Sequence, residues 1–304
     1  MIFATYFTFR WVKNHSFFNI IMIALGIGLA MSSKLSGALI SILTAAMFLI
    51  VLIQIIRKKD SSLSIKKLLI QFAVFAVIVF PIGLFWPLFA YINYQQPILY
   101  VWTSLSPQIG VADGVTWFDK YGYFNFYLYY HYPYMVLWKS GSHLPQDYNI
   151  YDAMLKSSLF GEFSYDSRLI PLSYILITLN LLVAIAFAVL TIYLIIKFII
   201  LKNRDHKNKT KHNYLNNTIY GMAILFLIFF INYIIFTAKN PYLCSYDFRY
   251  IVPIVIPFAY FIGLGIDKIS ASKKLVLNKY VPNITAITVL LLAISTCVFY
   301  CIIR

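Results

Sequence analysis

Acidic side chains are scarce in this sequence of 304 residues. It has 10 Asp and Glu against 25 Lys and Arg, and 12% of its residues are charged while 61% are hydrophobic. Soluble globular domains have about 45–50% apolar and about 25% charged residues, and disordered chains are less hydrophobic still. The composition excludes both classes and predicts an integral membrane protein.

Cysteine is also rare, and the signatures of soluble catalysts are missing. Three cysteines (Cys244, Cys297 and Cys301) are too few for a disulfide framework. The sequence has no Walker A loop, dinucleotide fingerprint, metalloprotease histidine pair or nucleophile elbow. Five histidines fall on separate segments, so no metal site is predicted from them: His15, His131, His143, His206 and His212.

Seven long apolar runs account for most of the chain. A membrane helix needs roughly 20 mostly apolar residues, and backbone groups inside lipid must pair within the helix. The sequence therefore predicts an all-α, polytopic helical bundle in three parts, with three spans in 1–92, a large loop over 93–170 and four spans in 171–304. The predicted spans are 17–33, 35–56, 68–92, 171–201, 218–238, 250–267 and 282–303. Prolines predict kinks in the third run (Pro81, Pro87) and in the sixth (Pro253, Pro257).

The positive charge of the chain, +15, follows the predicted loops. Fourteen basic residues lie in the connections 57–67, 202–217 and 268–281, which share one side if the spans alternate. Cytoplasmic loops are enriched in Lys and Arg. We therefore expect these loops and the N-terminus in the cytoplasm, the loop 93–170 outside it, and a bacterial plasma membrane around the chain. Topology explains the charge, so no nucleic-acid partner is expected.

The loop 93–170 is both acidic and aromatic. Seven tyrosines lie between Tyr121 and Tyr134. Six of the ten acidic residues are in this loop: Asp113, Asp119, Asp147, Asp152, Glu162 and Asp166. One interpretation is an interfacial layer, because Tyr and Trp settle at headgroup level. The other is a platform for a carbohydrate or a lipid headgroup, in which rings stack on sugars and carboxylates bind hydroxyls.

Two basic side chains at predicted span ends are candidates for binding a phosphate. Lys34 follows Ser33 in a tight turn between the first two spans, where hydroxyl neighbours suit a phosphate; the alternative is a lysine that snorkels to the surface. Arg249 lies between Asp247 and Tyr250, and a guanidinium can hold a phosphate with two parallel hydrogen bonds. The alternative is an Arg–Asp pair at the membrane surface.

Both segments resemble one family. Residues 26–37 (GIGLAMSSKLSG) and 248–253 (FRYIVP) resemble the glycine-rich Ser-Lys turn and the Phe-Arg-Tyr step of protein O-mannosyltransferases and their bacterial relatives. These are membrane glycosyltransferases of the GT-C fold. The resemblance implies transfer of a sugar from a polyprenyl-phosphate carrier to a glycan or protein acceptor outside the cytoplasm, without a nucleotide sugar. Lys34 and Arg249 would bind the lipid phosphate, with Ser33, Asp247 and Tyr250 in support.

The resemblance also implies that one element of the family is missing from this chain. Family members carry the catalytic acid in an external loop after the first span, and this chain has no such loop. We therefore expect the chain to be the C-terminal portion of a longer enzyme, inactive without a partner that supplies the missing N-terminal half. Weak candidates for the catalytic base are Asp113, Asp119, Glu162 and Asp166, and a divalent cation is a further candidate ligand. The alternatives are a transporter or flippase for a polar lipid or sugar, and a non-catalytic membrane assembly subunit.

Overall fold

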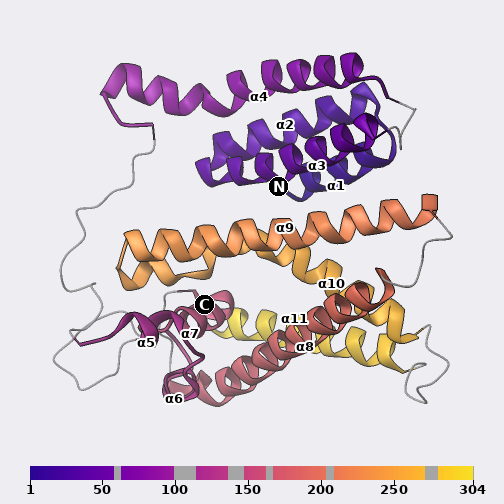
Figure 1. The fold of residues 1–304 in the computed structure, drawn as a ribbon. Helices are drawn as coiled ribbons and strands as arrows, with labels where there is room; N and C mark the ends of the chain where they lie inside the picture. The colour runs from indigo at the N-terminus through magenta and orange to yellow at the C-terminus, as the bar shows by residue number, and fades with distance from the viewer. Residues whose placement is uncertain are drawn as a thin grey trace. The chain divides into compact units, whose positions relative to one another are not determined.

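The structure, a computed structural model, describes residues 1–57, 63–98, 114–135, 147–161, 167–202, 209–270 and 280–303. In these ranges the chain forms α-helices and short 3-10 helices, and no strand occurs there (Figure 1). The prediction of an all-α chain is confirmed.

The chain divides into two units, each described by itself. The first comprises residues 1–102 and 205–231, and the second comprises 103–204 and 232–304, so that the long helix α9 contributes to both. The helices of the first unit are α1 (Ile2–Lys13), α2 (Phe17–Ser33), η1 (Leu35–Ala38), α3 (Leu39–Ile56), α4 (Ile65–Tyr94) and the first part of α9 (Lys209–Lys239).

Helix α2 is the centre of the first unit and packs against α1 and α4. Two glycines allow this close approach. A Cβ atom at Gly28 would lie 3.0 Å from the side chain of Ile82 on α4, and one at Gly26 would lie 3.0 Å from Phe3 on α1. Membrane helices associate through such small residues, because lipid supplies no hydrophobic force between them.

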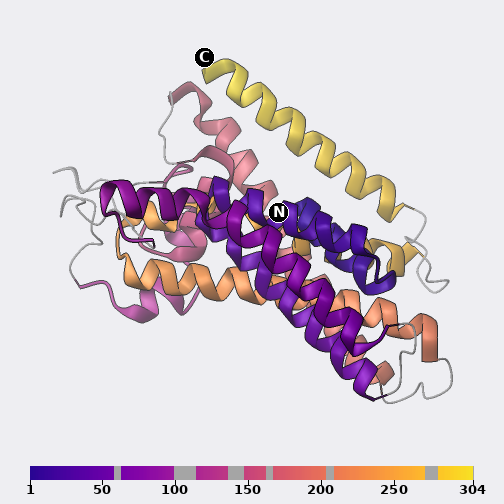
Figure 2. The same ribbon diagram turned by 90° about the horizontal axis from the view of Figure 1, so that it is seen from above.

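The second unit has four long helices and several short ones. Its elements are α5 (Trp117–Tyr121), α6 (Phe126–His131), α7 (Ile150–Phe160), η3 (Ser167–Leu169), α8 (Ile170–Lys202), the end of α9, η4 (Leu243–Tyr246), η5 (Phe248–Tyr250), η6 (Val252–Ile254), α10 (Val255–Ser270) and α11 (Val281–Ile303). Helix α8 packs against α10 and α11, and α11 runs as one continuous helix (Figure 2). We call α5, α6 and α7 together the short-helix layer.

Five helical segments of the described chain are long and apolar enough to cross a membrane: Leu35–Ile56, Ile65–Tyr94, Ser167–Val189, Asn217–Lys239 and Pro282–Cys301. The chain is therefore an integral membrane protein. Two shorter apolar helices, Phe17–Ser33 and Val252–Asp267, lie where the first and sixth spans are predicted. Helices thus occupy all seven predicted positions. The chain has seven spans only if both of these shorter helices also cross the membrane.

The predicted kinks need one correction. Pro81 and Pro87 lie inside α4, as expected. Pro253 lies in the separate turn η6, and Pro257 lies in the first turn of α10, which begins at Val255. The N–H groups of a first helical turn have no partner within the helix, so proline is tolerated there without a kink. The prediction of a kink inside the sixth span is wrong.

Candidate functional site

The short-helix layer contacts one end of each long helix of the second unit. It lies at the N-terminal end of α8, the C-terminal ends of α9 and α11, and the turns that precede α10. Three hydrogen bonds fasten it: Tyr121 OH to Thr237 Oγ1 (3.4 Å), Tyr129 OH to the carbonyl of Ile177 (2.8 Å), and Tyr300 OH to the carbonyl of Leu159 (2.6 Å). Helix α8 and the turns before α10 meet the layer at N-terminal ends, whereas α9 and α11 meet it at C-terminal ends. The four helices therefore alternate in direction.

Each short helix begins at a residue whose side chain caps it. Thr116 caps α5, Asn125 caps α6 and Asn149 caps α7, in each case by accepting a backbone N–H of the first turn. Asn149 also donates from Nδ2 to the carbonyls of Asp119 (2.9 Å) and Tyr123 (2.7 Å). The amide of one capping residue therefore joins α7 to α5 and to the segment that follows α5.

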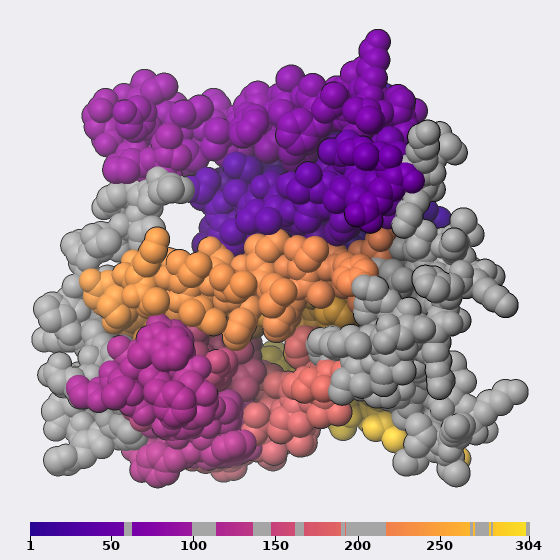
Figure 3. Space-filling model, viewed as in Figure 1, coloured from indigo at the N-terminus to yellow at the C-terminus, as the bar shows by residue number. Residues whose placement is uncertain are grey.

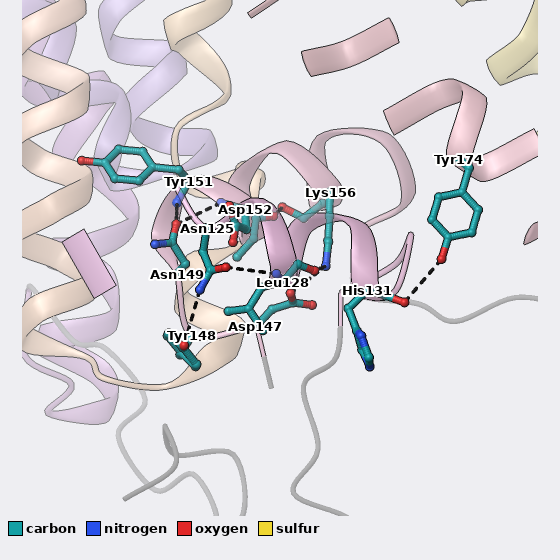
Figure 4. A network of polar contacts seen from close by, with 12 residues as sticks. Asn125, Leu128, His131, Asp147, Tyr148, Asn149, Tyr151, Asp152, Lys156 and Tyr174 are labelled. Carbon is teal, nitrogen blue, oxygen red and sulfur yellow. Dashed lines mark hydrogen bonds and ion pairs between the residues drawn. The ribbon is translucent and has the colours of Figure 1, made fainter. Parts of the chain in front are cut away.

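A buried lysine links α7 to α6 and to the segment that precedes α7. Nζ of Lys156 lies 2.7 Å from Oδ1 of Asp147, three residues before α7, and the two side chains are only 1% and 2% exposed. The same ammonium donates to the carbonyl of Leu128 on α6 at 2.7 Å (Figure 4). Removing one partner of such a pair leaves an uncompensated buried charge. The contact of α7 with α6 at this point therefore depends on Lys156, whose charge Asp147 compensates.

Asp152 lies one helical turn before Lys156 on α7 and is fully buried. Neither of its carboxylate oxygens has a hydrogen-bond partner of good geometry among the described residues. Burial raises the pKa of Asp152 to about 8; the nearby Lys156 ammonium lowers the pKa, the Asp147 carboxylate raises it, and the backbone N–H of Asn125 lowers it. Asp152 is therefore mostly protonated at neutral pH.

Arg249 extends from a turn that is fixed on two sides. The buried carboxylate of Asp247 accepts the backbone N–H of Arg249 at 2.6 Å. The N–H of Phe248 donates to Oγ of Ser157 on α7 at 2.8 Å. The Arg249 side chain is exposed, and its Cζ lies 5.1 Å from the ring centroid of Tyr250. The turn thus presents a guanidinium beside the short-helix layer, and phosphate binding by Arg249 stays a prediction.

Lys34 ends helix α2 in the first unit. Its N–H donates to the carbonyl of Ala30 (3.0 Å), and its own carbonyl accepts the N–H of Gly37 (2.7 Å). A Cβ atom at Gly37 would lie 2.4 Å from the carbonyl carbon of Ala30, so the turn requires glycine. The side chains of Lys34 and Ser33 are exposed. Lys34 and Arg249 belong to different units, and their sharing one pocket stays a prediction.

One of the four candidate bases is described. Oδ2 of Asp119 accepts from the N–H (2.9 Å) and from Oγ1 (2.6 Å) of Thr116, which completes the capping box of α5. These hydrogen bonds lower the pKa of Asp119 and make it a weaker base. Asp113, Glu162 and Asp166 lie outside the described residues.

The pair of Asp147 and Lys156 and the buried Asp152 were not among the predicted site residues. Two sequence signals point to part of this cluster: Asn149 and Asp152 have the spacing of a helix start, and Asp152 and Lys156 are four residues apart. In the described ranges no three His, Cys, Asp or Glu side chains could hold one metal ion, and the candidate divalent cation therefore has no placed site.

Comparisons with known proteins leave the family open. No protein-family model, no curated protein and no solved structure matches the chain. Family and activity are therefore inferred from the residues and the geometry of the chain itself.

Proposed function

We propose that the chain is a seven-span membrane glycosyltransferase of the GT-C type that moves a sugar from a polyprenyl-phosphate carrier to a glycan or protein acceptor outside the cytoplasm. One observation carries this function: an exposed guanidinium, that of Arg249, stands on a turn fixed by Asp247 and Ser157 at one end of the helical bundle. The resemblance of residues 26–37 and 248–253 to protein O-mannosyltransferases supports the same conclusion.

The chemistry requires a cation at the phosphate. In the transfer step the bond between the anomeric carbon and the phosphate oxygen breaks, and a bond from that carbon to the acceptor oxygen forms. Arg249 neutralises the departing phosphate, and Lys34 remains a predicted phosphate ligand of the first unit. A carboxylate accepts the proton of the acceptor hydroxyl, and the candidates for that role remain Asp113, Asp119, Glu162 and Asp166.

The distribution of basic residues supports an extracytoplasmic site. The ends of α8, α9 and α11 that meet the short-helix layer are opposite to the basic connections 202–217 and 268–281. Because basic loops stay in the cytoplasm, the layer and the Arg249 turn face the other compartment, where lipid-linked sugars are used without nucleotide.

Binding of a fluorescent polyprenyl phosphate to the full chain in liposomes tests this function. Arg249→Ala is expected to weaken binding about tenfold to hundredfold, because a hydrogen-bonded charge contributes about 1.5–3 kcal/mol. Arg249→Lys retains the charge without the bidentate geometry, so its affinity should lie between those of the unmodified chain and Arg249→Ala. Lys239→Ala removes another exposed cation of the second unit and should leave binding unchanged. Equal affinity of Arg249→Ala and the unmodified chain refutes the lipid-phosphate site.

A second candidate function is a non-catalytic membrane assembly subunit. Each described carboxylate near the Arg249 turn has a place in the packing of the fold. Asp119 and Asp247 cap helices, Asp147 is in the ion pair with Lys156, and Asp152 is buried. Under this function Arg249→Ala leaves lipid binding unaffected.

A further inference from the structure

Helices α5 and α6 each bury one side and expose two large aromatic side chains on the other. On α5 Tyr121 is buried, while Trp117 and Phe118 are 66% and 62% exposed. On α6 Leu128 and Tyr129 are buried. Its first two residues are Phe126 and Tyr127, which are 60% and 66% exposed. Figure 3 shows the short-helix layer as the lower magenta group. Four rings in fifteen residues are more apolar surface than a water-facing loop normally carries.

The contacts of the layer fix its depth along the long helices. Thr237 is two residues before the end of α9, and Tyr300 is three residues before the end of α11. Ile177 is seven residues after the start of α8, which is about 10 Å at 1.5 Å per residue. The layer therefore lies within about 10 Å of the helix ends.

Helix α8 is long enough to place that level in the headgroups. Its 33 residues extend about 50 Å, which exceeds the roughly 30 Å hydrocarbon layer by about 20 Å. Polar residues of α8 occur near both of its ends, with Thr191, Tyr193, Lys197 and Lys202 toward its C-terminal end. Those near its start bond to the short-helix layer or to carbonyls of α8 and the turn before it: Ser173, Tyr174, Thr178 and Asn180. The level of α6 and α7 is thus that of the membrane–water interface.

An exposed apolar side of α8 begins beside the contact between α8 and the end of α6. The hydroxyl of Tyr174 donates to the carbonyl of His131 at the end of α6 (3.3 Å). The next residue, Ile175, is 56% exposed, as is Leu182 two turns further along at 57%. Lipid that covers this side of α8 therefore also reaches the end of α6.

We propose that the aromatic side of α5 and α6 is a membrane-binding surface, inserted into the headgroup layer of the same bilayer that the long helices cross. Trp and Tyr favour that layer because an apolar ring and a polar edge are both accommodated there. The surface would hold the short-helix layer, and with it the turn of Arg249, at the level of lipid phosphates. This holds whether or not the chain transfers a sugar.

Site-directed spin labelling of the full chain in vesicles of phosphatidylcholine and phosphatidylglycerol tests the surface. Labels are placed singly at Phe118→Cys and Tyr127→Cys after Cys244, Cys297 and Cys301 have been replaced by serine or alanine. Collision rates with oxygen, which concentrates in lipid, are compared with those for a water-soluble nickel chelate. The matched references are Asn14→Cys, exposed in the short segment between α1 and α2, and Leu182→Cys, exposed on α8.

We expect an oxygen-to-nickel ratio at Phe118→Cys and Tyr127→Cys several-fold above that at Asn14→Cys and below that at Leu182→Cys. A ratio equal to that at Asn14→Cys means a water-facing surface and overturns the proposal. Low collision with both reagents means that protein, such as a second copy, covers the surface, and also overturns it. The fluorescence of Trp117 gives a second measurement: lipids brominated near the headgroup should quench the unmodified chain more than the Trp117→Phe variant.

Discussion

The buried carboxyl of Asp152 predicts a distinct pH dependence of stability. The pKa of Asp152 is raised from 3.8 to about 8, because burial disfavours the charged form. Between these two values the folded chain keeps a proton that the unfolded chain has released. The contribution of Asp152 to stability is thus fully present only below about pH 4, and it falls as pH rises toward 8, at about 1.4 kcal/mol per pH unit.

The substitution Asp152→Asn removes this ionisation while keeping the shape of the side chain. From pH 5 to pH 8 the unmodified chain should lose about 4 kcal/mol from this residue, and the variant should lose none of it. Thermal unfolding of both chains in one detergent, followed by fluorescence at intervals of half a pH unit, measures the difference. Asp119→Asn is the matched control, because the lowered pKa of Asp119 makes its contribution disappear only on acidification, below about pH 4.

Parallel stability curves for the unmodified chain and Asp152→Asn between pH 5 and pH 8 would refute the reasoning. They would mean that Asp152 is solvated or paired in the folded chain. A steeper curve for the variant would contradict the sign of the pKa shift itself.

Three further substitutions test the packing around the site. Lys156→Met alone should lower the free energy of unfolding by about 3–5 kcal/mol, and adding Asp147→Leu should restore most of it, because the pair then leaves no buried charge; chemical denaturation checks both. Gly37→Ala should destabilise by about 1–3 kcal/mol or more, since its Cβ atom would collide with the backbone of α2, whereas Gly263→Ala, with open space around it, should not; thermal unfolding separates them. Ser157→Ala should weaken polyprenyl-phosphate binding a few-fold by freeing the turn of Arg249, and Ser157→Thr, which keeps the hydroxyl, should restore it.

The long helices could be predicted from the sequence because their signal is local. The run 35–56 coincides with Leu35–Ile56, and 68–92 lies within Ile65–Tyr94. A stretch of apolar residues of that length has few alternatives in lipid. The start of α10 was less predictable, because the chain forms the turns η5 and η6 between Asp247 and the first residue of the helix.

The candidate site could be predicted only in part. The tight turn at Lys34 and the exposed guanidinium of Arg249 follow from short motifs. The burial of Asp152 and the hydrogen bond from Lys156 to the carbonyl of Leu128 depend on the packing of α7 on α6, and no spacing within the sequence fixes that packing. The hydrogen bond from the N–H of Phe248 to Ser157 joins residues 91 apart in the sequence, and no local pattern could predict it either.

The central claim is that the guanidinium of Arg249 holds a lipid phosphate, and the affinity for polyprenyl phosphate tests it most directly. Affinities of the unmodified chain, Arg249→Ala and Lys239→Ala are measured in one liposome system. The account predicts that Arg249→Ala weakens binding about tenfold to hundredfold while Lys239→Ala leaves it unchanged. Unchanged affinity of Arg249→Ala, or an equal loss in both variants, would contradict it.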